Sequence, residues 1–409
     1  MPKPRLWVVS ELYYPEQTST GYFLTEIAEG LADVFDVQVI CGKPSYSERG
    51  IAVVRTEERH GTVIHRMHAT HFNKDRLVLR TVNALTLAVA ASVFALVRLR
   101  RGDRMLIVTN PPTLPPILAL IARLRGVRSY LLVHDVYPEV LAATGMMKPS
   151  GTAWRIAGAF FNRTLGWFDR IVVLGRDMQS LIDRKVAAGH GRAATTIIPN
   201  WGDVDEIRPI VRAENPFAIE HGLVDRFVIQ FSGNIGRTHD VELLLDVARR
   251  VEDLPHVVFL FVGYGGQAGT VAARGGANLR YLPRQPRERL NAMLACSDAT
   301  VIAFKPAMNG VSVPSRMYNV MAAGVPIVAI ADADAELSRT VVENDAGWQL
   351  ASGDADGLEA LIRHLAGPDG RTEAATRGLN ARRALEPQYT LPRIVAQYRA
   401  LLSDPQAGA

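Results

Sequence analysis

The sequence predicts an α/β protein built from two Rossmann-like, doubly wound domains that face a central cleft. Three observations predict this fold class. The chain has 409 residues, too many for one ordinary hydrophobic core and enough for two domains. Short apolar runs alternate with segments of helical periodicity, and this series occurs twice. Residues 203–214, which contain several acidic residues and a proline, separate the two series, and we interpret them as an interdomain linker.

The first series begins with a strand, a loop, a helix and a second strand, the building block of a doubly wound sheet. We expect the first strand at residues 6–10, a loop through Gly21, the helix at 22–31 and the next strand at 37–41. Further strands are expected at residues 105–109, 129–133 and 170–174. The first domain would therefore comprise residues 1–202.

The second series has the same alternation of strands and helices. Strands are expected at residues 226–231, 257–262, 279–281, 299–303 and 326–330, and helices at 241–251, 288–295 and 316–323. The second domain would comprise residues 203–387. We expect a last helix at about residues 388–405 to pack back on the first domain.

The composition limits the classes of partner. Lys plus Arg is 46 and Asp plus Glu is 41, a net charge of +5, which fits an anionic ligand or a membrane surface and fits plain solubility equally well. The sequence contains no tract of the kind that binds nucleic acid, so no nucleic-acid partner is expected. The two cysteines, Cys41 and Cys296, adjoin apolar runs and are interpreted as core thiols in a reducing compartment. The apolar stretch after Arg5 is too short for a signal peptide.

Two glycine loops follow predicted strands of the second domain. The first contains Gly233 and Gly236 and ends where a helix begins near Asp240, so its N–H groups could approach a diphosphate, with Arg237 adding charge. Glycine could equally serve only to make the turn. The second loop, residues 262–266, raises the expectation of a nucleotide, because ligands bind at the carboxyl ends of parallel strands.

A third segment, residues 309–329, comprises a loop, a short helix and a strand. Pro314 and Ser315 suit a helix start, and Ser315 could cap the helix. Arg316 would then lie in the first turn, where the helix dipole disfavours a cation. A bound anion would resolve this conflict, and we favour that interpretation over a surface arginine paired with an acidic neighbour.

Together these segments resemble the donor-binding half of the retaining glycosyltransferases of family 4, which have the GT-B fold. The resemblance is closest to bacterial colanic-acid and O-antigen amino-sugar transferases. The matching segments are Gly233-Asn-Ile-Gly236, Pro314-Ser-Arg316, Tyr318-Asn-Val-Met-Ala-Ala-Gly324, Asp135-Val-Tyr-Pro-Glu139, the opening Tyr14-Pro-Glu…Gly21 and the hinge Ile198-Pro-Asn200…Asp205.

The resemblance implies an enzyme that transfers a sugar, with retention, from a nucleotide diphosphate, with uridine as the expected base. It implies no cofactor, no metal and no protein nucleophile, because donors on the phosphates supply the main catalytic effect. Residues expected to take part in transfer are His134, Asp135, Arg237 and Arg316. Residues expected to bind the donor are Gly21, Gly233, Asn234, Gly236, His239, Gly263, Gly265, Arg284, Ser312, Pro314, Ser315 and Asn319.

The chain departs from the family pattern at four positions. Two family glutamates, which bind the ribose and the sugar, fall near Val311 and on Asn319; an asparagine can still bind a ribose, but a valine cannot bind a sugar hydroxyl. The usual Arg and Lys of the first loop fall near Asn234 and His239, so the two arginines named above are expected to supply the charge. The family has a histidine at the position of His134 that touches the transferred sugar; the alternative is a histidine that caps a strand end.

Residues 82–97 carry no charge and are flanked by Arg76, Arg80, Arg98, Arg100 and Arg101. One interpretation is a core helix with solvated ends. The other is a helix partly embedded in the membrane interface, with its arginines at anionic headgroups. The resemblance, which implies a polyprenyl-diphosphate-linked acceptor, favours the second and a cytoplasmic protein held at the inner face of the cytoplasmic membrane.

Two other functions keep the same architecture: a sugar-nucleotide epimerase and a non-catalytic subunit. The segment from Tyr318 to Gly324 argues against the first, and the phosphate arginines argue against the second. His65, His68 and His71 resemble a metal cluster only in number, and a solvated segment is the preferred interpretation.

Overall fold

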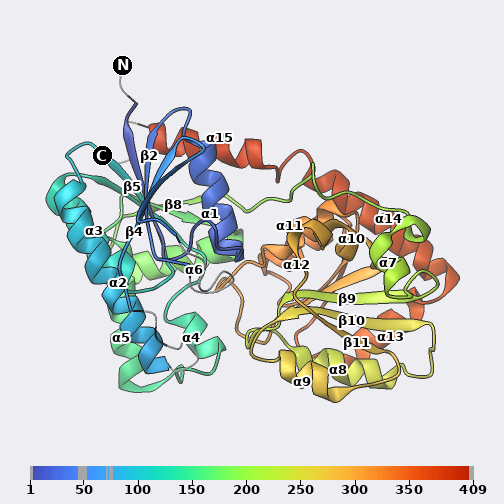
Figure 1. Cartoon of the computed structure of the whole chain (residues 1–409). Coiled ribbons are helices and arrows are strands. Elements are labelled where there is room, and N and C mark those ends of the chain that lie inside the picture. The colour runs from blue at the N-terminus through green and yellow to red at the C-terminus, as the bar shows by residue number, and fades with distance from the viewer. Residues whose placement is uncertain (1–2, 45–52, 71, 73–76, 405–409) are drawn as a thin grey trace. The chain divides into compact units, whose positions relative to one another are not determined.

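The computed structural model describes residues 3–44, 53–70, 72 and 77–404. The chain divides into two compact units (Figure 1). Unit 1 comprises Met1–Ala142, Met147–Pro199 and Leu391–Ala409, and unit 2 comprises Ala143–Met146 and Asn200–Thr390. Each unit contains one sheet, so the predicted series of strands and helices corresponds to two separate α/β bodies.

Unit 1 contains an eight-stranded sheet in the order β3-β4-β2-β1-β5-β6-β7-β8. All neighbouring strands are parallel except β3 and β4. The strands are β1 (Arg5–Val9), β2 (Asp36–Cys41), β3 (Thr56–Arg59), β4 (Thr62–Arg66), β5 (Arg104–Val108), β6 (Arg128–Leu132), β7 (Arg170–Val173) and β8 (Ala194–Ile197). The five strands predicted from apolar runs are confirmed to within one residue at each end, because buried parallel strands are nearly continuous apolar segments.

The helices of unit 1 are α1 (Ser19–Gly30), α2 (Leu77–Arg98), α3 (Leu114–Arg125), α4 (Glu139–Ala143), α5 (Gly151–Leu165), α6 (Arg176–Ala188) and α15 (Leu391–Ser403). Helix α1 begins three residues earlier than predicted, because the Thr18 side chain caps it by accepting a hydrogen bond from the Gly21 N–H group at 3.3 Å. Gly21 therefore lies in the first turn of a helix and not in the loop expected from sequence. Helix α15 packs against α1, where Arg399 pairs with Asp33 at 2.6 Å.

Unit 2 contains a six-stranded, fully parallel sheet in the order β11-β10-β9-β12-β13-β14. The strands are β9 (Phe227–Asn234), β10 (Val257–Tyr264), β11 (Leu279–Pro283), β12 (Ala299–Ala303), β13 (Ile327–Ile330) and β14 (Gly347–Leu350). The helices are α7 (Pro216–Glu220), α8 (Val241–Arg250), α9 (Ala268–Arg274), α10 (Leu290–Ala295), α11 (Arg316–Ala322), α12 (Glu336–Glu343), α13 (Ala355–Leu365) and α14 (Pro368–Leu385), with 3-10 turns at Arg212–Glu214 and Arg287–Arg289.

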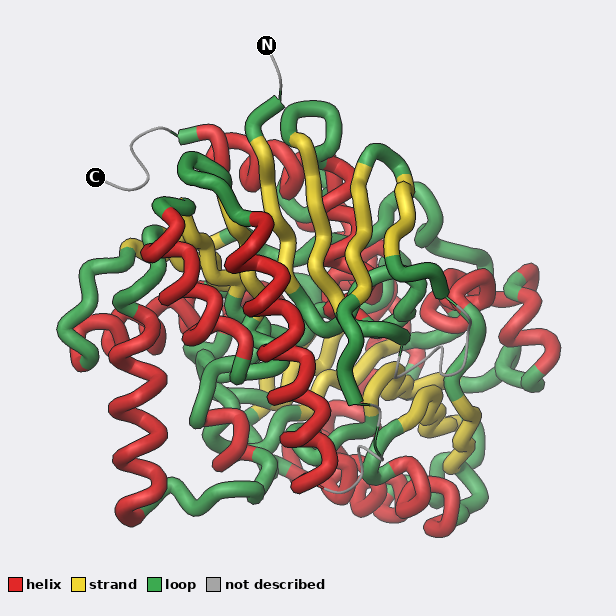
Figure 2. The backbone as a smooth tube through the Cα atoms, turned by 60° about the vertical axis from the view of Figure 1, so that its left-hand side comes forward, coloured by secondary structure: helices red, strands yellow, loops and turns green. Residues whose placement is uncertain are grey.

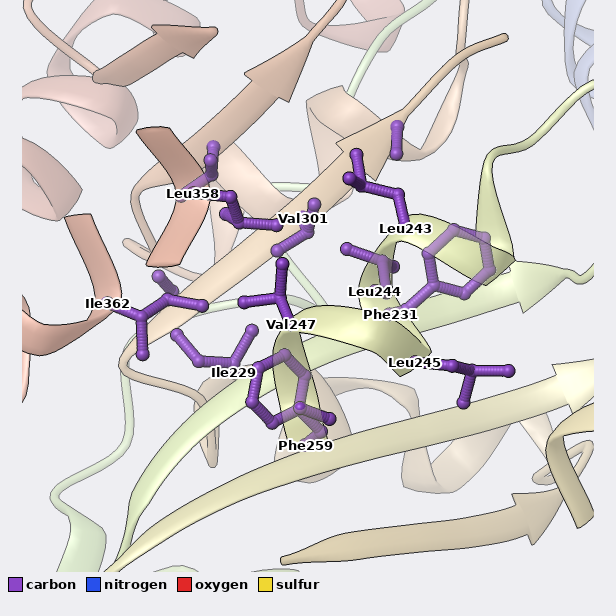
Figure 3. Packing of buried hydrophobic residues seen from close by; sticks show 14 of the residues in the cluster. Ile229, Phe231, Leu243, Leu244, Leu245, Val247, Phe259, Val301, Leu358 and Ile362 are labelled. Atoms are coloured by element: carbon purple, nitrogen blue, oxygen red, sulfur yellow. The ribbon is translucent and has the colours of Figure 1, made fainter. Parts of the chain in front are cut away.

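The core of unit 2 forms where α8 and α13 pack on the sheet (Figure 3). Ile229 and Phe259 from the strands belong to one cluster with Val247 from α8 and Ile362 from α13, and all four are buried. Each such side chain contributes roughly 1.5–3 kcal/mol by leaving water. Asp240 caps α8 by accepting from the Leu243 N–H group at 3.3 Å, which confirms the helix start expected near that residue.

The segment interpreted as a free linker is instead fixed to unit 2. Asp203 pairs with Arg287 at 3.1 Å, and Arg212 pairs with Asp298 at 2.9 Å. Arg382 donates to the Ile207 carbonyl at 2.9 Å. The chain passes between the units around Ala143–Met146, at Pro199–Asn200 and at Thr390–Leu391, so residues 203–214 are not the connector that their composition suggested.

The strand order of each sheet marks where a ligand site can form. In unit 2 the chain proceeds from β9 to β10 and β11 on one side, and then from β12 to β13 and β14 on the other. The order reverses between β9 and β12, and ligands bind outside the carboxyl ends of strands at such a point. In unit 1 the order reverses between β1 and β5 in the same way.

Candidate functional site

The two glycine loops of unit 2 interlock at the carboxyl ends of β9 and β10. The strands stay paired to their ends, with Gly233 opposite Gly263 and Asn234 opposite Tyr264. A Cβ at Gly263 would lie 1.9 Å from the Gly233 carbonyl oxygen, and one at Gly265 would lie 2.5 Å from Asn234 Oδ1. Backbone packing therefore requires glycine at 263 and 265, whether or not a ligand is bound.

The same edge of the sheet carries exposed groups. Gly233 and Asn234 are exposed, and Gly233 has a φ of 112°, a conformation that favours glycine. The Arg284 guanidinium lies 5.6 Å from the centre of the Tyr264 ring, which is partly exposed. The carboxyl ends of β10 and β11 thus present an aromatic ring and a cation side by side.

Arg316 lies at the reversal of strand order, against the end of β9. Its Nη1 donates to the Ser232 carbonyl at 2.7 Å, its guanidinium lies 4.5 Å from the centre of the Phe231 ring, and its Nη2 contacts His239. Burial lowers the pKa of Arg316 to about 10. Within the described part of the chain no carboxylate lies within ion-pair distance of this guanidinium. The alternative of a surface arginine paired with an acidic neighbour is therefore wrong.

The expected cap of α11 is also wrong. Ser315 occupies the N-cap position with helical backbone angles, and its side chain makes no capping hydrogen bond. A capping side chain needs an extended backbone to reach the free N–H groups of the first turn. Pro314 is buried beside it, and Ser312 is half-buried.

His239 lies behind Arg316 and not at the surface of the site. The ring stacks on Phe304 with centroids 5.2 Å apart, and Nδ1 lies 3.0 Å from the Ala303 carbonyl. Burial, and then the charge of Arg316, hold the pKa of His239 well below its usual value. A neutral, buried imidazole in this place supports the guanidinium, which differs from the direct donor contact expected from sequence.

The remaining predicted residues of unit 2 differ in accessibility. Arg237 is exposed in the first glycine loop beside Gly236, and it has no hydrogen bond or ion pair with any residue that the structure describes. Asn319 Oδ1 accepts from the Asp203 N–H group at 3.3 Å, so this side chain fixes the start of unit 2. Val311 is buried and apolar, as its residue type implied.

Sequence reasoning missed Lys305, which directly follows β12 and the stacked Phe304. The backbone N–H group of Lys305 donates to the Thr238 carbonyl at 3.0 Å, which links the end of β12 to the first glycine loop. The position of a lysine just after a strand, at a reversal of strand order, was the available signal.

In unit 1, His134 joins the segments that follow β1, β5 and β6. The Nδ1 atom of its ring lies 3.2 Å from Thr20 Oγ1, and its backbone N–H group donates to Thr109 Oγ1 at 3.1 Å. The Asp135 N–H group donates to the same hydroxyl at 3.3 Å. Burial lowers the pKa of His134 to about 4, so the imidazole is neutral at pH 7. Gly21 lies one residue after Thr20, and a Cβ there would meet the Glu16 carbonyl at 2.7 Å.

A small, mostly apolar cavity lies beside Asp135. Pro112 and Pro116 line it from the start of α3, and Phe161 and Leu165 line it from α5. Lys185, also in the lining, pairs with Glu139 at 2.6 Å. This cavity was not predicted from the sequence, because the cavity depends on the packing of separate helices.

Helix α2 contains the uncharged run. It is 22 residues long, and it is long and apolar enough to cross a membrane by length and composition. Its inner stripe, which includes Leu87, Ala88, Ala91 and Ala95, is buried, and its ends lead into strands of one sheet, so it is a surface helix of unit 1. Its outer stripe is apolar and exposed. The inner side of this helix therefore belongs to the core of unit 1, and the membrane interpretation stays a prediction for its outer side.

The predicted membrane arginines that the structure describes are all exposed: Arg80, Arg98, Arg100 and Arg101. Arg76 lies outside the described residues. His65 Nε2 donates to Gln38 Oε1 at 2.9 Å in the sheet. No group of three potential metal ligands occurs among the described residues, which do not include His71. Cys41 and Cys296 are buried free thiols, as predicted.

Comparison with known proteins identifies the family. Residues 226–367 match the model of the glycosyl transferases group 1. Over 408 residues the chain is 31% identical to the probable glycosyltransferase WbjE of Pseudomonas aeruginosa, covering 98% of this chain and 99% of WbjE. The chain belongs to the group 1 glycosyltransferases. The resemblance to family 4 is thereby confirmed, and the chain is an enzyme.

Further comparisons agree with this assignment. The enzyme is 26% identical over 343 residues to the putative colanic acid biosynthesis glycosyl transferase WcaI of Escherichia coli strain K12, covering 80% of this chain and 83% of WcaI. Its fold is similar to sucrose-phosphate synthase from Thermosynechococcus elongatus, with a TM-score of 0.73 at 15% identity and 98% of each chain covered. It is similar to HepE from Anabaena in complex with UDP-glucose, with a TM-score of 0.71 at 16% identity, covering 98% of this chain and 99% of HepE. The fold is GT-B, as predicted.

The interlocked glycine loops generate a test of stability. Gly263→Ala should lower the free energy of unfolding by roughly 2–4 kcal/mol, because the added methyl group collides with the Gly233 carbonyl. Gly266→Ala is the matched control, since a Cβ there meets nothing within 4 Å. Urea unfolding measures both. Equal stability of the two variants would show that the loops do not pack this closely.

Proposed function

We propose that this glycosyltransferase takes a sugar from a UDP-sugar, with retention of configuration, and adds it to a lipid-linked saccharide in the synthesis of a cell-surface polysaccharide. The observation that carries the donor assignment is the half-buried Arg316 guanidinium without a carboxylate partner at the reversal of strand order. An unpaired charge that is partly withdrawn from water is unfavourable. A diphosphate bound there supplies the missing negative charge through charge-assisted hydrogen bonds.

The other donor contacts follow from the same edge of the sheet. Gly233 and Asn234 are exposed and Gly236 is half-buried, and their backbone N–H groups are proposed to donate to phosphate oxygens beside Arg316. Tyr264 and Arg284 offer a surface on which a pyrimidine base can stack. The solved structure of HepE with UDP-glucose, which has the same fold, supports uridine as the base.

Bond breaking needs charge stabilisation more than it needs a protein nucleophile. As the bond between sugar and phosphate breaks, the sugar carbon becomes oxocarbenium-like and the leaving diphosphate gains charge. Arg316 and Arg237 stabilise that charge where a divalent ion would otherwise act. The acceptor hydroxyl then attacks from the face that the phosphate leaves, and a phosphate oxygen takes its proton.

His134 acts on the transferred sugar in this proposal. Nδ1 is engaged with Thr20, which leaves Nε2 to bond a sugar hydroxyl. The imidazole is neutral, so it serves as a hydrogen-bonding group and not as a charged acid. Asp135, one residue further, adds a carboxylate on the acceptor side.

The alternative functions are weaker on the same residues. A sugar-nucleotide epimerase needs acidic residues to move a proton or to hydrolyse a glycal, and the two positions at which the family carries glutamates are held by Val311 and Asn319. A non-catalytic subunit has no need to keep a half-buried cation unpaired.

The acceptor and the place of work are proposed from α2 and from the relatives. WcaI is named for colanic acid biosynthesis, and the polyprenyl-diphosphate-linked acceptor is what the resemblance to polysaccharide enzymes implies. The exposed apolar stripe of α2, flanked by exposed arginines, suits the interface of an anionic membrane. We place the enzyme at the inner face of the cytoplasmic membrane.

Substitution of Arg316 tests the proposed donor site. Arg316→Ala should weaken UDP binding by roughly 1.5–3 kcal/mol, about ten- to a hundredfold, because it removes charged hydrogen bonds in a half-buried place. Arg237→Ala should cost less, about 0.5–1 kcal/mol, since that side chain is exposed. The control is Arg371→Ala, which removes an arginine stacked on Phe227 at the other end of β9. Calorimetry with UDP decides, and unchanged affinity in the Arg316 variant would refute the assignment.

His134 tests the transfer step. His134→Ala should lower kcat on the order of a hundredfold while leaving UDP affinity unchanged. Because the folded pKa lies at about 4, below the unfolded value of about 6.5, the wild-type rate should show no step near pH 6.5. For the same reason the contribution of neutral His134 to the free energy of unfolding is fully present above pH 6.5. This contribution is lost as the pH falls through about 4. An equal loss of UDP affinity would mean that His134 belongs to the nucleotide site.

The flanking arginines test membrane association. Replacing Arg76, Arg80, Arg98, Arg100 and Arg101 by Gln should weaken binding to anionic liposomes at least roughly a hundredfold, because each arginine near the surface adds about 1 kcal/mol. The control replaces five exposed arginines of unit 2: Arg249, Arg250, Arg274, Arg363 and Arg383. Flotation at low salt measures both. Wild-type protein that stays at the bottom of the gradient would remove the membrane from the proposal.

A further inference from the structure

Three helices of unit 1 form one layer on the sheet. Helix α2 packs against α3, and α3 packs against α5. In Figure 1 all three lie on the same side of unit 1, and Figure 2, turned to bring that side forward, shows long helices in front of the strands. The layer is formed from segments up to 88 positions apart, from Leu77 to Leu165, so no sequence window reveals it.

The outward side chains of this layer are apolar on every helix. They include more than half of the large apolar side chains that are exposed in unit 1. On α2 they are Val78, Leu85, Val89, Val93, Leu96 and Val97; on α3 they are Ile117, Leu120 and Leu124; on α5 they are Ile156 and Phe160. Their exposed fractions range from 38% to 74%. Contiguous exposed apolar surface on a folded protein marks a site of contact.

The charge of the layer has one sign. The sequences of α2, α3 and α5 contain no aspartate and no glutamate, although the whole chain has 41 acidic residues in 409. They contain six arginines, all exposed: Arg80, Arg98, Arg123, Arg125, Arg155 and Arg163. We call these eleven apolar and six basic side chains the acid-free face.

We propose that the acid-free face is the surface on which the enzyme lies against an anionic lipid bilayer, with α3 and α5 inserting apolar side chains together with α2. This inference rests on the proposed membrane association and extends it from one helix to a layer of three. Apolar side chains enter the boundary of the acyl chains, and the arginines reach the headgroups beside them.

The charge pattern selects the bilayer over a second copy of the chain. A twofold contact between two such faces would bring arginines from both copies together with no carboxylate to pair them. Anionic headgroups supply negative charge to every arginine at once, and a fluid bilayer adapts to three parallel ridges.

The cavity beside Asp135 is lined partly by the helices of this face. The helices that expose Leu120 and Phe160 outward are the same helices whose inner side chains, Pro116 and Phe161 among them, line that cavity. The cavity that Asp135 lines therefore lies directly inside the layer, so an acceptor anchored in the bilayer under α3 and α5 would lie on the side of unit 1 that carries this residue.

The test changes only α3 and α5. In the full chain, Leu120, Leu124, Ile156 and Phe160 become Gln, which leaves every arginine and all of α2 in place. Binding to vesicles of phosphatidylcholine with phosphatidylglycerol should weaken roughly tenfold or more in flotation, because apolar insertion is lost while charge is kept. The matched control changes four exposed apolar residues of unit 2, Val211, Ile219, Val342 and Leu379, and should float as the wild type does.

The other outcomes separate this inference from the proposed function. If the α3–α5 variant floats as well as wild type while Leu85, Val89 and Val93 changed to Gln abolish flotation, contact is limited to α2 and the inference is wrong. If wild type does not float, the membrane proposal itself fails. If the α3–α5 variant floats normally but loses self-association in ultracentrifugation, the face binds a second copy. UDP affinity, measured in every variant, should stay unchanged and reports on the donor site alone.

Discussion

The Arg316 guanidinium, which has no carboxylate partner among the described residues, links the groups at the carboxyl edge of the second sheet. Arg316 closes the end of β9 through the Ser232 carbonyl and lies over Phe231. His239, stacked on Phe304, fixes it from the side of β12. The neighbouring glycine loops can approach one another only because Gly263 and Gly265 have no side chains. The proposed diphosphate site is centred on this cation, which has no carboxylate partner among the described residues.

The sequence predicted those parts of the molecule that depend on local pattern. Buried parallel strands are continuous apolar runs, so β1, β2, β5, β6 and β7 were found to within a residue at each end. Glycines placed directly after strands marked both loops of unit 2, and the motif around Pro314 and Arg316 marked the family. These signals survive because each is fixed by a few neighbouring residues and a known periodicity.

The features that the sequence did not reveal depend on contacts between distant segments. Strand β3, Thr56–Arg59, is polar throughout and exists only because it pairs with β4. Residues 203–214 read as a linker, but ion pairs to Arg287 and Asp298 fix them to unit 2. The place of His239 depends on Phe304, 65 positions later, and the acid-free face depends on helices that meet only in the folded unit.

The chain passes from unit 2 back to unit 1 for the last time at Thr390–Leu391, and this order affects how the protein folds during synthesis. Helix α15 belongs to unit 1, where Ile394, Tyr398 and Leu402 are buried. Unit 2 is therefore inserted within the sequence of unit 1. During synthesis the ribosome must complete the whole of unit 2 before the last helix of the first unit emerges. Until then the surface of unit 1 that α15 covers stays exposed, whereas unit 2 can fold without α15.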